Sequence, residues 1–146
     1  MTFTERINED LKFSMKAQNK ERTETLRSLR SAMIELSKTG KNVSSDDEMK
    51  AILIQAKRRR DAYDAFISAG REDLVNKEKN ELLIIEEYLP SQLTESEIRS
   101  EVESIIKNLN VSGIDSFKLV MPLAVSKMKG RASGSVIQSI VKELLS

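Results

Sequence analysis

Apolar residues recur every three or four positions along most of the chain, the spacing that places side chains on one face of an α-helix. The pattern begins after Thr2 and Glu5, which have the spacing of a capping box, and it stops at Gly40, a residue suited to the left-handed turn that closes a helix. Because Asn19 and Lys20 interrupt the pattern only weakly, it predicts either one helix or two before Gly40. The apolar positions of this stretch are Phe3, Ile7, Leu11, Met15, Leu26, Leu29, Met33, Ile34 and Leu36.

Two further helices are predicted before Pro90. Ser45 and Glu48 repeat the capping-box spacing ahead of a long apolar stripe that stops at Gly70. Another stripe starts after Asp73 and must end at Pro90, because the residue before a proline is pushed out of helical geometry. The two stripes are Met49, Ile52, Leu53, Ala56, Tyr63, Phe66 and Ile67, and Leu74, Leu82, Leu83, Ile85, Tyr88 and Leu89. We therefore expect a hinge that begins at Pro90.

A smaller set of helices is predicted after this hinge. Thr94 and Glu97 form a third capping box, and the stretch 110–113 breaks the helix that follows it. Pro122 falls inside the next apolar stripe and predicts a kink or a restart of the helix there, since proline lacks a backbone donor. Ser133 can cap a last helix. The candidate N-caps of the middle helix are Asp115 and Ser116, and the three stripes contain Ile98, Val102, Ile105, Ile106 and Leu109; Phe117, Val120, Met121, Val125 and Met128; and Val136, Ile137, Ile140, Val141, Leu144 and Leu145.

These patterns predict an all-α protein in two parts. No run of alternating polar and apolar residues competes with the helices, and aromatic residues make up only 4% of the chain against 32% charged residues, a mixture that favours helices with charged surfaces. Residues 1–90 are expected to form an N-terminal helical bundle. Residues 91–146 are expected to form a small helical tail domain.

Composition argues against enzyme chemistry. The chain has no Cys, which excludes disulfides and thiol nucleophiles, and no His, which removes the usual general base near neutral pH and the commonest zinc ligand. The five glycines show neither a phosphate-binding loop nor a dinucleotide-binding pattern. We therefore expect no catalytic residue, no metal ion and no cofactor.

The sequence predicts a cytoplasmic location. Residues 1–12 mix acidic and basic side chains with apolar ones, so they lack the uninterrupted apolar core of a signal peptide. No apolar stretch approaches the length that spans a bilayer. We expect no membrane partner.

The formal net charge of +1 hides a strong imbalance along the chain. The segment 1–89 is balanced, with 17 basic and 17 acidic residues, whereas 90–117 carries two basic and five acidic residues. The segment 118–142 then carries five basic residues and no acidic one. Any affinity for nucleic acid is therefore expected to be modest and local to the C-terminal part of the chain.

Three of these cations surround a turn that leads into a predicted helix. Lys127, Lys129 and Arg131 alternate around Gly130, and the helix after Ser133 would present its unpaired first N–H groups to the same place. A helix N-terminus attracts anions, so the turn is a candidate phosphate site; the alternative is a solvated turn that only aids solubility. The predicted phosphate contacts are Lys127, Lys129, Gly130, Arg131, Ser133, Gly134, Ser135 and Lys142.

A second basic run, Lys57 to Arg60, lies in the middle of a predicted helix. Consecutive residues point in different directions around a helix, so the four side chains cannot form one patch. Ion pairs with the nearby acids Glu48, Asp61 and Asp64 are the expected role of this run. The alternative places Lys57, Arg60 and Tyr63 along one side of the helix that faces a ligand.

Several segments, in their order and spacing, resemble the YqeY family across nearly the whole chain. Those before the predicted hinge are Asp10-Leu11-Lys12, Met15-Lys16, Leu29-Arg30, Lys57-Arg58-Arg59-Arg60-Asp61-Ala62, Gly70-Arg71-Glu72-Asp73-Leu74 and Glu81. Tyr88-Leu89-Pro90-Ser91-Gln92-Leu93 spans the hinge, and Lys129-Gly130-Arg131-Ala132-Ser133-Gly134, with Val136 and Val141-Lys142, matches the family's most distinctive turn. Ser133 replaces the Asp that the family usually has there, and Lys118 and Pro122 stand where the family often has glycines. Since Ser and Asp both cap helices, the fold is expected to tolerate the first exchange.

The C-terminal part of this family is similar to the tail domain of the B subunit of the tRNA-dependent amidotransferase, in which the tail helps to hold tRNA and the chemistry lies in other domains. The resemblance implies an N-terminal helical bundle joined to a helical tail. It leads to three hypotheses. The first is a noncatalytic accessory protein that binds tRNA or another structured RNA. The second is a module that docks on an amidotransferase or aminoacyl-tRNA synthetase subunit, and the third is a carbon–nitrogen ligase with glutamine as amide donor.

Overall fold

The computed structural model describes residues 1–40 and 42–146, and all regular structure in them is helical. The prediction of an all-α fold is therefore confirmed. The chain divides into two compact units, Met1–Pro90 and Ser91–Ser146. Each unit has a hydrophobic core of its own.

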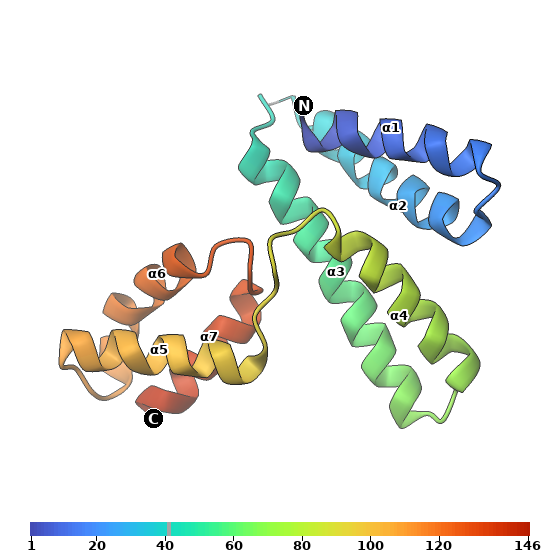
Figure 1. The fold of residues 1–146 in the computed structure, drawn as a ribbon. Coiled ribbons are helices and arrows are strands. Elements are labelled where there is room, and N and C mark those ends of the chain that lie inside the picture. Colours follow the sequence, from blue (N-terminus) through green and yellow to red (C-terminus); the bar gives the residue numbers. More distant parts are fainter. Residues whose placement is uncertain (41) are drawn as a thin grey trace. The chain divides into compact units, whose positions relative to one another are not determined.

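The N-terminal unit is built from two helical hairpins. In Figure 1, α1 lies beside α2 and α3 lies beside α4, so the helices within each pair run antiparallel. The helices are α1 (Phe3–Lys16), α2 (Lys20–Ser37), α3 (Ser45–Ser68) and α4 (Glu72–Glu86). The buried apolar core consists of Ile7, Leu11, Leu26, Leu29, Met33, Ile52, Ala56, Ile85, Tyr88 and Leu89. These positions come from the predicted stripes.

Local caps decide where these helices begin. Thr2 accepts a hydrogen bond from the N–H of Glu5, as predicted, and Asn19 caps α2 directly after Gln18, whose φ of 56° breaks the helix. The stretch before Gly40 therefore contains two helices. The cap of α3 was predicted one residue too late, because Ser44 forms the capping box with Asp47.

The basic run of α3 pairs mainly with acids of α4. Lys57 does pair with Asp61 at 2.9 Å, as predicted, but Arg59 lies 3.2 Å from Glu81 and 3.6 Å from Glu78. The remaining pair joins Arg60 to Glu86 at 3.7 Å. Burial raises the pKa of the Glu81 carboxyl, and the Arg59 charge opposes that rise.

Glu48 was wrongly predicted to pair with that basic run. Its carboxylate is buried and accepts hydrogen bonds from the N–H of Thr4 at 2.9 Å and from the Thr4 hydroxyl at 2.6 Å. The contact joins the beginning of α3 to the first turn of α1. Two donors compensate for the lost hydration of this carboxylate.

Polar contacts fix the end of α4 to the first hairpin. The Tyr88 hydroxyl donates to Asp10, and the guanidinium of Arg6 lies 4.5 Å from the centre of the Tyr88 ring. Arg22 pairs with Glu87 through two bonds of 2.7 and 3.3 Å. Regular helix ends at Glu86, earlier than the stripe predicted, because the next three N–H groups bond to carbonyls three residues back.

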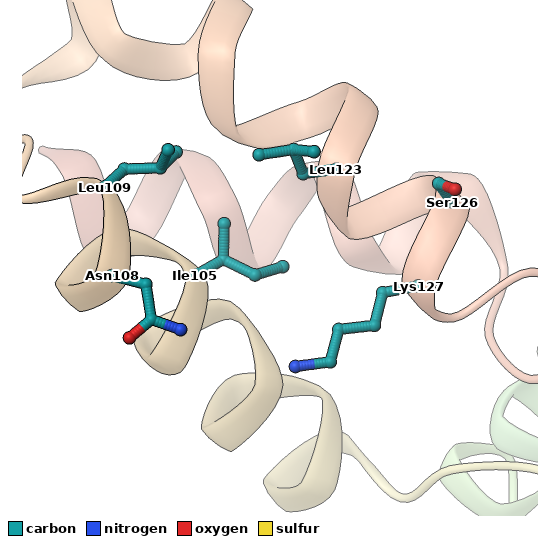
Figure 2. A pocket seen from close by; sticks show the side chains of 6 residues that line it. All are labelled: Ile105, Asn108, Leu109, Leu123, Ser126 and Lys127. Atoms are coloured by element: carbon teal, nitrogen blue, oxygen red, sulfur yellow. The ribbon is translucent and has the colours of Figure 1, made fainter.

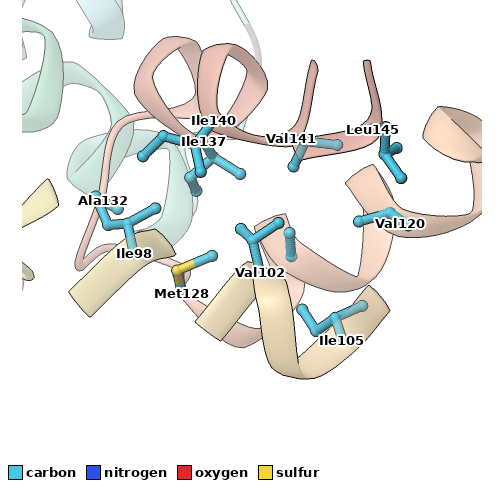
Figure 3. Close-up of a cluster of buried hydrophobic side chains, with 11 residues drawn as sticks. Ile98, Val102, Ile105, Val120, Met128, Ala132, Ile137, Ile140, Val141 and Leu145 are labelled. Carbon is cyan, nitrogen blue, oxygen red and sulfur yellow. The ribbon is translucent and has the colours of Figure 1, made fainter. Parts of the chain in front are cut away.

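The second unit is a small helical bundle around one apolar core. Its helices are α5 (Glu95–Leu109), the short 3₁₀ helix Ile114–Ser116, α6 (Phe117–Lys127) and α7 (Gly134–Leu145). Figure 3 shows core side chains pointing inward from these helices and from the turn between α6 and α7. The core consists of Ile98, Val102, Ile105, Val120, Ala124, Met128, Ala132, Ile137, Ile140, Val141 and Leu145. Thr94 and Glu97 form the predicted capping box at the start of α5.

Helix α6 departs from the expectations in two details, because no restart occurs at Pro122 and the N-cap side chain makes no capping bond. The helix continues through Pro122 without a restart. The proline leaves only the Lys118 carbonyl without its usual partner, and both residues are exposed, so water can take the place of that bond. Ser116 stands at the cap position but makes no capping bond, because its hydroxyl donates to the carbonyl of Ser112 at 3.0 Å.

Within the part of the chain that the structure describes, no helix has both the length and the apolar character needed to cross a membrane.

Candidate nucleic-acid interface

The turn between α6 and α7 is held in one conformation by its own backbone. Gly130 has a φ of 75°, in the left-handed region that side chains disfavour, and the N–H of Arg131 bonds to the carbonyl of Met128 at 2.9 Å. Ser133 caps α7 by accepting from the N–H of Val136 at 3.3 Å, as predicted. The motif that distinguished the sequence is therefore a defined turn at the start of a helix.

The segment 91–93 packs along this turn through three polar contacts. The N–H of Leu93 donates to the Arg131 carbonyl at 2.9 Å, and the side chain of Gln92 donates to the Gly130 carbonyl at 2.8 Å. The Nε of Arg131 donates in return to the Ser91 carbonyl at 2.9 Å. The predicted site did not include these three supporting residues, although they belong to the Ser91-Gln92-Leu93 segment that carried the family resemblance.

The predicted cations are not gathered in one place. Figure 2 shows Lys127 extending from the end of α6 toward α5, where its Nζ lies 2.8 Å from Glu101. Lys142 stands in the last turn of α7, roughly 12 Å along the helix axis from Gly134, with its Nζ 5.9 Å from the centre of the Phe117 ring. Lys129 and Arg131 are the predicted cations that flank the turn itself, and both are exposed.

The start of α7 adds backbone donors beside those two cations. The first N–H groups of a helix lack partners inside it. Because Ser133 takes the N–H of Val136, those of Gly134 and Ser135 are the ones that point out of the helix end. Ser133 and Ser135 also lie within hydrogen-bond distance of each other, 3.2 Å between their hydroxyl oxygens. Together these groups can bind an anion such as a phosphate without any neighbouring carboxylate in the cap.

A second feature of this unit is a shallow apolar groove between α5 and α6 (Figure 2). Its volume is about 350 Å³, and it is lined by Ile105, Asn108, Leu109, Leu123, Ser126 and Lys127. Leu119 and Leu123 occupy the exposed side of α6, four residues apart. The predicted stripe of α6 contained neither Leu119 nor Leu123, so sequence reasoning missed this surface.

Acidic side chains do not form a metal-binding group in residues 1–40 and 42–146, where no cluster of three or more suitable ligands occurs.

Comparisons with known proteins identify relatives along almost the whole chain. Residues 4–145 match the model of the Yqey-like protein family. "Altered inheritance of mitochondria protein 41, mitochondrial" of Pyrenophora tritici-repentis is 34% identical over 134 residues, which cover 89% of this chain and 73% of that protein. The protein of the same name from Lachancea thermotolerans is 32% identical over 151 residues, covering 94% of this chain and 78% of that protein.

Proposed function

The chain belongs to the Yqey-like protein family, and on that basis we propose that this helical accessory protein is noncatalytic and binds tRNA or another structured RNA. The observation that carries the proposal is the turn before α7. There two exposed cations, Lys129 and Arg131, stand beside the open N-terminus of a helix. A cytoplasmic location remains a prediction.

The groups of this turn are suited to binding the phosphate backbone of an RNA. The ammonium of Lys129 and the outer nitrogens of Arg131 can each pair with a phosphate oxygen, while the N–H groups of Gly134 and Ser135 bind the same or the next phosphate. Lys127 and Lys142 act at longer range through their positive field. Such contacts orient an RNA without reading its sequence, so selectivity comes from RNA shape.

Binding of purified protein to total tRNA across a salt series tests the proposal. Replacing Lys129 by Ala should lower the affinity and reduce the slope of log K against log salt by about 0.7 to 0.9, the contribution of one phosphate neutralised by one cation. The triple variant with Lys127, Lys129 and Arg131 all changed to Ala should lose most of the salt slope.

The matched control is Lys118→Ala, which removes the same charge from an exposed position at the opposite end of α6. If Lys118→Ala weakens binding as much as Lys129→Ala, binding follows net charge and the turn is not a site. Absence of tRNA binding at low salt would reject the proposal. Glutamine-dependent amide transfer by the purified chain would reject its noncatalytic part.

The groove between α5 and α6 favours a second candidate function, docking on an amidotransferase or aminoacyl-tRNA synthetase subunit. Its apolar floor and the Lys127–Glu101 pair at its rim match the apolar centre and polar edge of a protein interface. The occupant would be one amphipathic helix of that subunit, with an acidic residue that competes with Glu101 for Lys127. Leu123→Asp should abolish such docking and leave tRNA binding by the turn unchanged, whereas undiminished docking would exclude the groove.

A further inference from the structure

The end of the α1–α2 hairpin is a second basic surface, which the sequence patterns did not single out. We call the last turns of α1, the connection and the first turns of α2 the hairpin end (Figure 1). Its half-buried cation Arg22 pairs with Glu87, and its four exposed cations are Lys12, Lys16, Lys20 and Arg27; its exposed acids are Glu21 and Glu24. None of these four cations forms an ion pair with any residue that the structure describes. Their charges are therefore available to an anionic ligand.

An exposed aromatic ring lies beside two of these cations. Phe13 is 77% exposed, more than any other aromatic residue in the described chain. Because successive residues are rotated by about 100° around a helix, the order around the outward side of α1 is Phe13, Lys16, Lys12 and then Met15. We call the edge at Met15 the far flank. Ser14 faces the opposite way and is buried against Thr23 of α2, which fixes this orientation.

A hollow adjoins the far flank. It has a volume of about 550 Å³ and is lined by Met15, Gln18, Lys20, Thr23, Glu24 and Arg27. Met15 is 50% exposed there. The hairpin end thus offers, in order around its surface, an aromatic ring, two ammonium groups, and a hollow that carries two further cations.

Single-stranded nucleic acid suits this combination. Proteins bind single strands by stacking bases on exposed aromatic rings while cations along the surface follow the phosphates. An anionic membrane surface suits it less, because an interfacial helix needs a continuous apolar face. On α1 the apolar residues Phe13 and Met15 are separated by Lys12 and Lys16.

We propose that the hairpin end binds a single-stranded stretch of RNA, with a base stacked on Phe13 and phosphates paired with Lys12, Lys16 and the cations of the hollow. This inference rests on the proposed function and extends it, since a structured RNA such as tRNA also has unpaired loops and ends. The turn before α7 would contact phosphates in a structured part of the RNA, and the hairpin end would bind an unpaired segment.

Stacking is tested first, with a twelve-nucleotide oligoadenylate and the full chain. Phe13→Leu keeps an apolar side chain but removes the flat ring, and it should weaken binding by at least about fivefold. Phe13→Trp should retain binding, and its fluorescence should be quenched by the stacked base; the chain has no other Trp, so the signal reports this position alone. Equal affinity of Phe13→Leu and the wild type would overturn the proposal, as would unquenched Trp fluorescence in the bound state.

The charge contribution has its own matched pair of variants. Lys12→Gln/Lys16→Gln should reduce the salt slope for oligoadenylate by about 1.4, because each phosphate on a single strand contributes about 0.7 to that slope. Lys50→Gln/Lys79→Gln removes the same charge from exposed positions on α3 and α4 and should leave the slope unchanged. A similar reduction in both variants would mean that net charge alone attracts the RNA, and the proposed site would be rejected.

Two outcomes separate this inference from the function on which it rests. If Lys129→Ala weakens tRNA binding while all hairpin variants bind oligoadenylate like the wild type, the turn is an RNA site and the hairpin end is not. If the hairpin variants lose oligoadenylate binding while Lys129→Ala has no effect on tRNA, the proposed turn fails and the hairpin end stands. Binding to vesicles of phosphatidylserine and phosphatidylcholine, abolished in Phe13→Leu, without binding to oligoadenylate would reassign the surface to membranes.

Discussion

The turn before α7 and the hairpin end are both rich in cations, but the two surfaces differ in whether those cations bond to other groups of the protein. In the tail unit, Lys127 pairs with Glu101 and Arg131 bonds to the Ser91 carbonyl. At the hairpin end, cations such as Lys12 and Lys16 form no ion pair with the described residues. A count of charges along the chain favours the tail unit as the anion-binding surface, whereas the structure shows that some of those cations already have partners within the fold.

The difference has a physical cause. A cation paired with a carboxylate must give up that pair, or share it, before it can neutralise a phosphate. An unpaired surface cation gives up mainly its hydration, and the counterions that it releases from the RNA phosphates drive binding at low salt. The two surfaces should therefore differ in rigidity and in salt dependence, and the following substitutions should change each one separately.

The largest effect is expected from the tail core. Ile137 is 1% exposed and packs against helices α5 and α6, so Ile137→Ala should lower the free energy of unfolding of this unit by about 2–5 kcal/mol. Thermal unfolding followed by circular dichroism measures the loss. Binding to tRNA through the turn should fall, whereas oligoadenylate binding by the hairpin end should persist, because Phe13 and its neighbouring cations belong to the N-terminal unit, which has its own core. If the variant lost both tRNA binding and oligoadenylate binding, the claim that the two surfaces act independently would be rejected.

The second largest effect is expected at Arg131, which supports the turn and which we propose to contact RNA. Arg131→Ala removes the bond to the Ser91 carbonyl and one phosphate partner, so tRNA affinity should fall by roughly tenfold at low salt. Hydrogen exchange at the Leu93 amide, which bonds to the Arg131 carbonyl, should become faster as the turn loosens.

Arg131→Lys provides the control for this double role. It keeps the charge but replaces the planar guanidinium with a single ammonium group. Partial recovery of affinity without recovery of slow exchange would separate the two roles. Full recovery of both would show that the bond to Ser91 contributes little to the shape of the turn.

The sequence predicted those parts of the fold that depend on neighbours within a few residues. Caps such as Thr2, Thr94 and Ser133 were identified correctly because a capping residue and its partner lie only three positions apart. The buried stripes were identified because helical periodicity is local as well. The error at Ser45 was a shift of one residue in a stretch of adjacent serines.

Contacts between distant residues could not be predicted in the same way. Glu101 lies 26 positions from the Lys127 that it neutralises, and the Ser91 carbonyl lies 40 positions from Arg131. On α3, Arg59 turns to Glu78 and Glu81 of the next helix instead of to acids in its own. The availability of a charge is a tertiary property, which explains why the hairpin end was overlooked and the tail cations were all counted as available.

Ser133→Asp should weaken RNA binding at the turn without harming the fold. The aspartate can cap α7 as serine does, and its charge interacts favourably with the helix N-terminus, so stability should stay the same or rise by up to about 1 kcal/mol. The same charge lies where a phosphate would bind, so tRNA affinity should fall a few-fold. Filter binding together with thermal unfolding separates the two effects. An unchanged tRNA affinity would place the bound phosphates away from the cap.

The smallest effect is expected from releasing a cation that the tail already uses. Glu101→Gln removes the partner of Lys127, so this ammonium group becomes like the unpaired cations of the hairpin end, and tRNA affinity should rise about two- to threefold with a steeper salt slope.

Glu103→Gln is the matched control, since it removes the same charge from an exposed position on α5 where no ion pair is broken within the described residues. If both variants gain equally, the gain comes from net charge alone. If Glu101→Gln gains and Glu103→Gln does not, pairing is what keeps Lys127 from the RNA. In that case the two basic surfaces differ in how many of their cations are available to RNA, because one carboxylate from a remote part of the sequence is enough to make Lys127 unavailable.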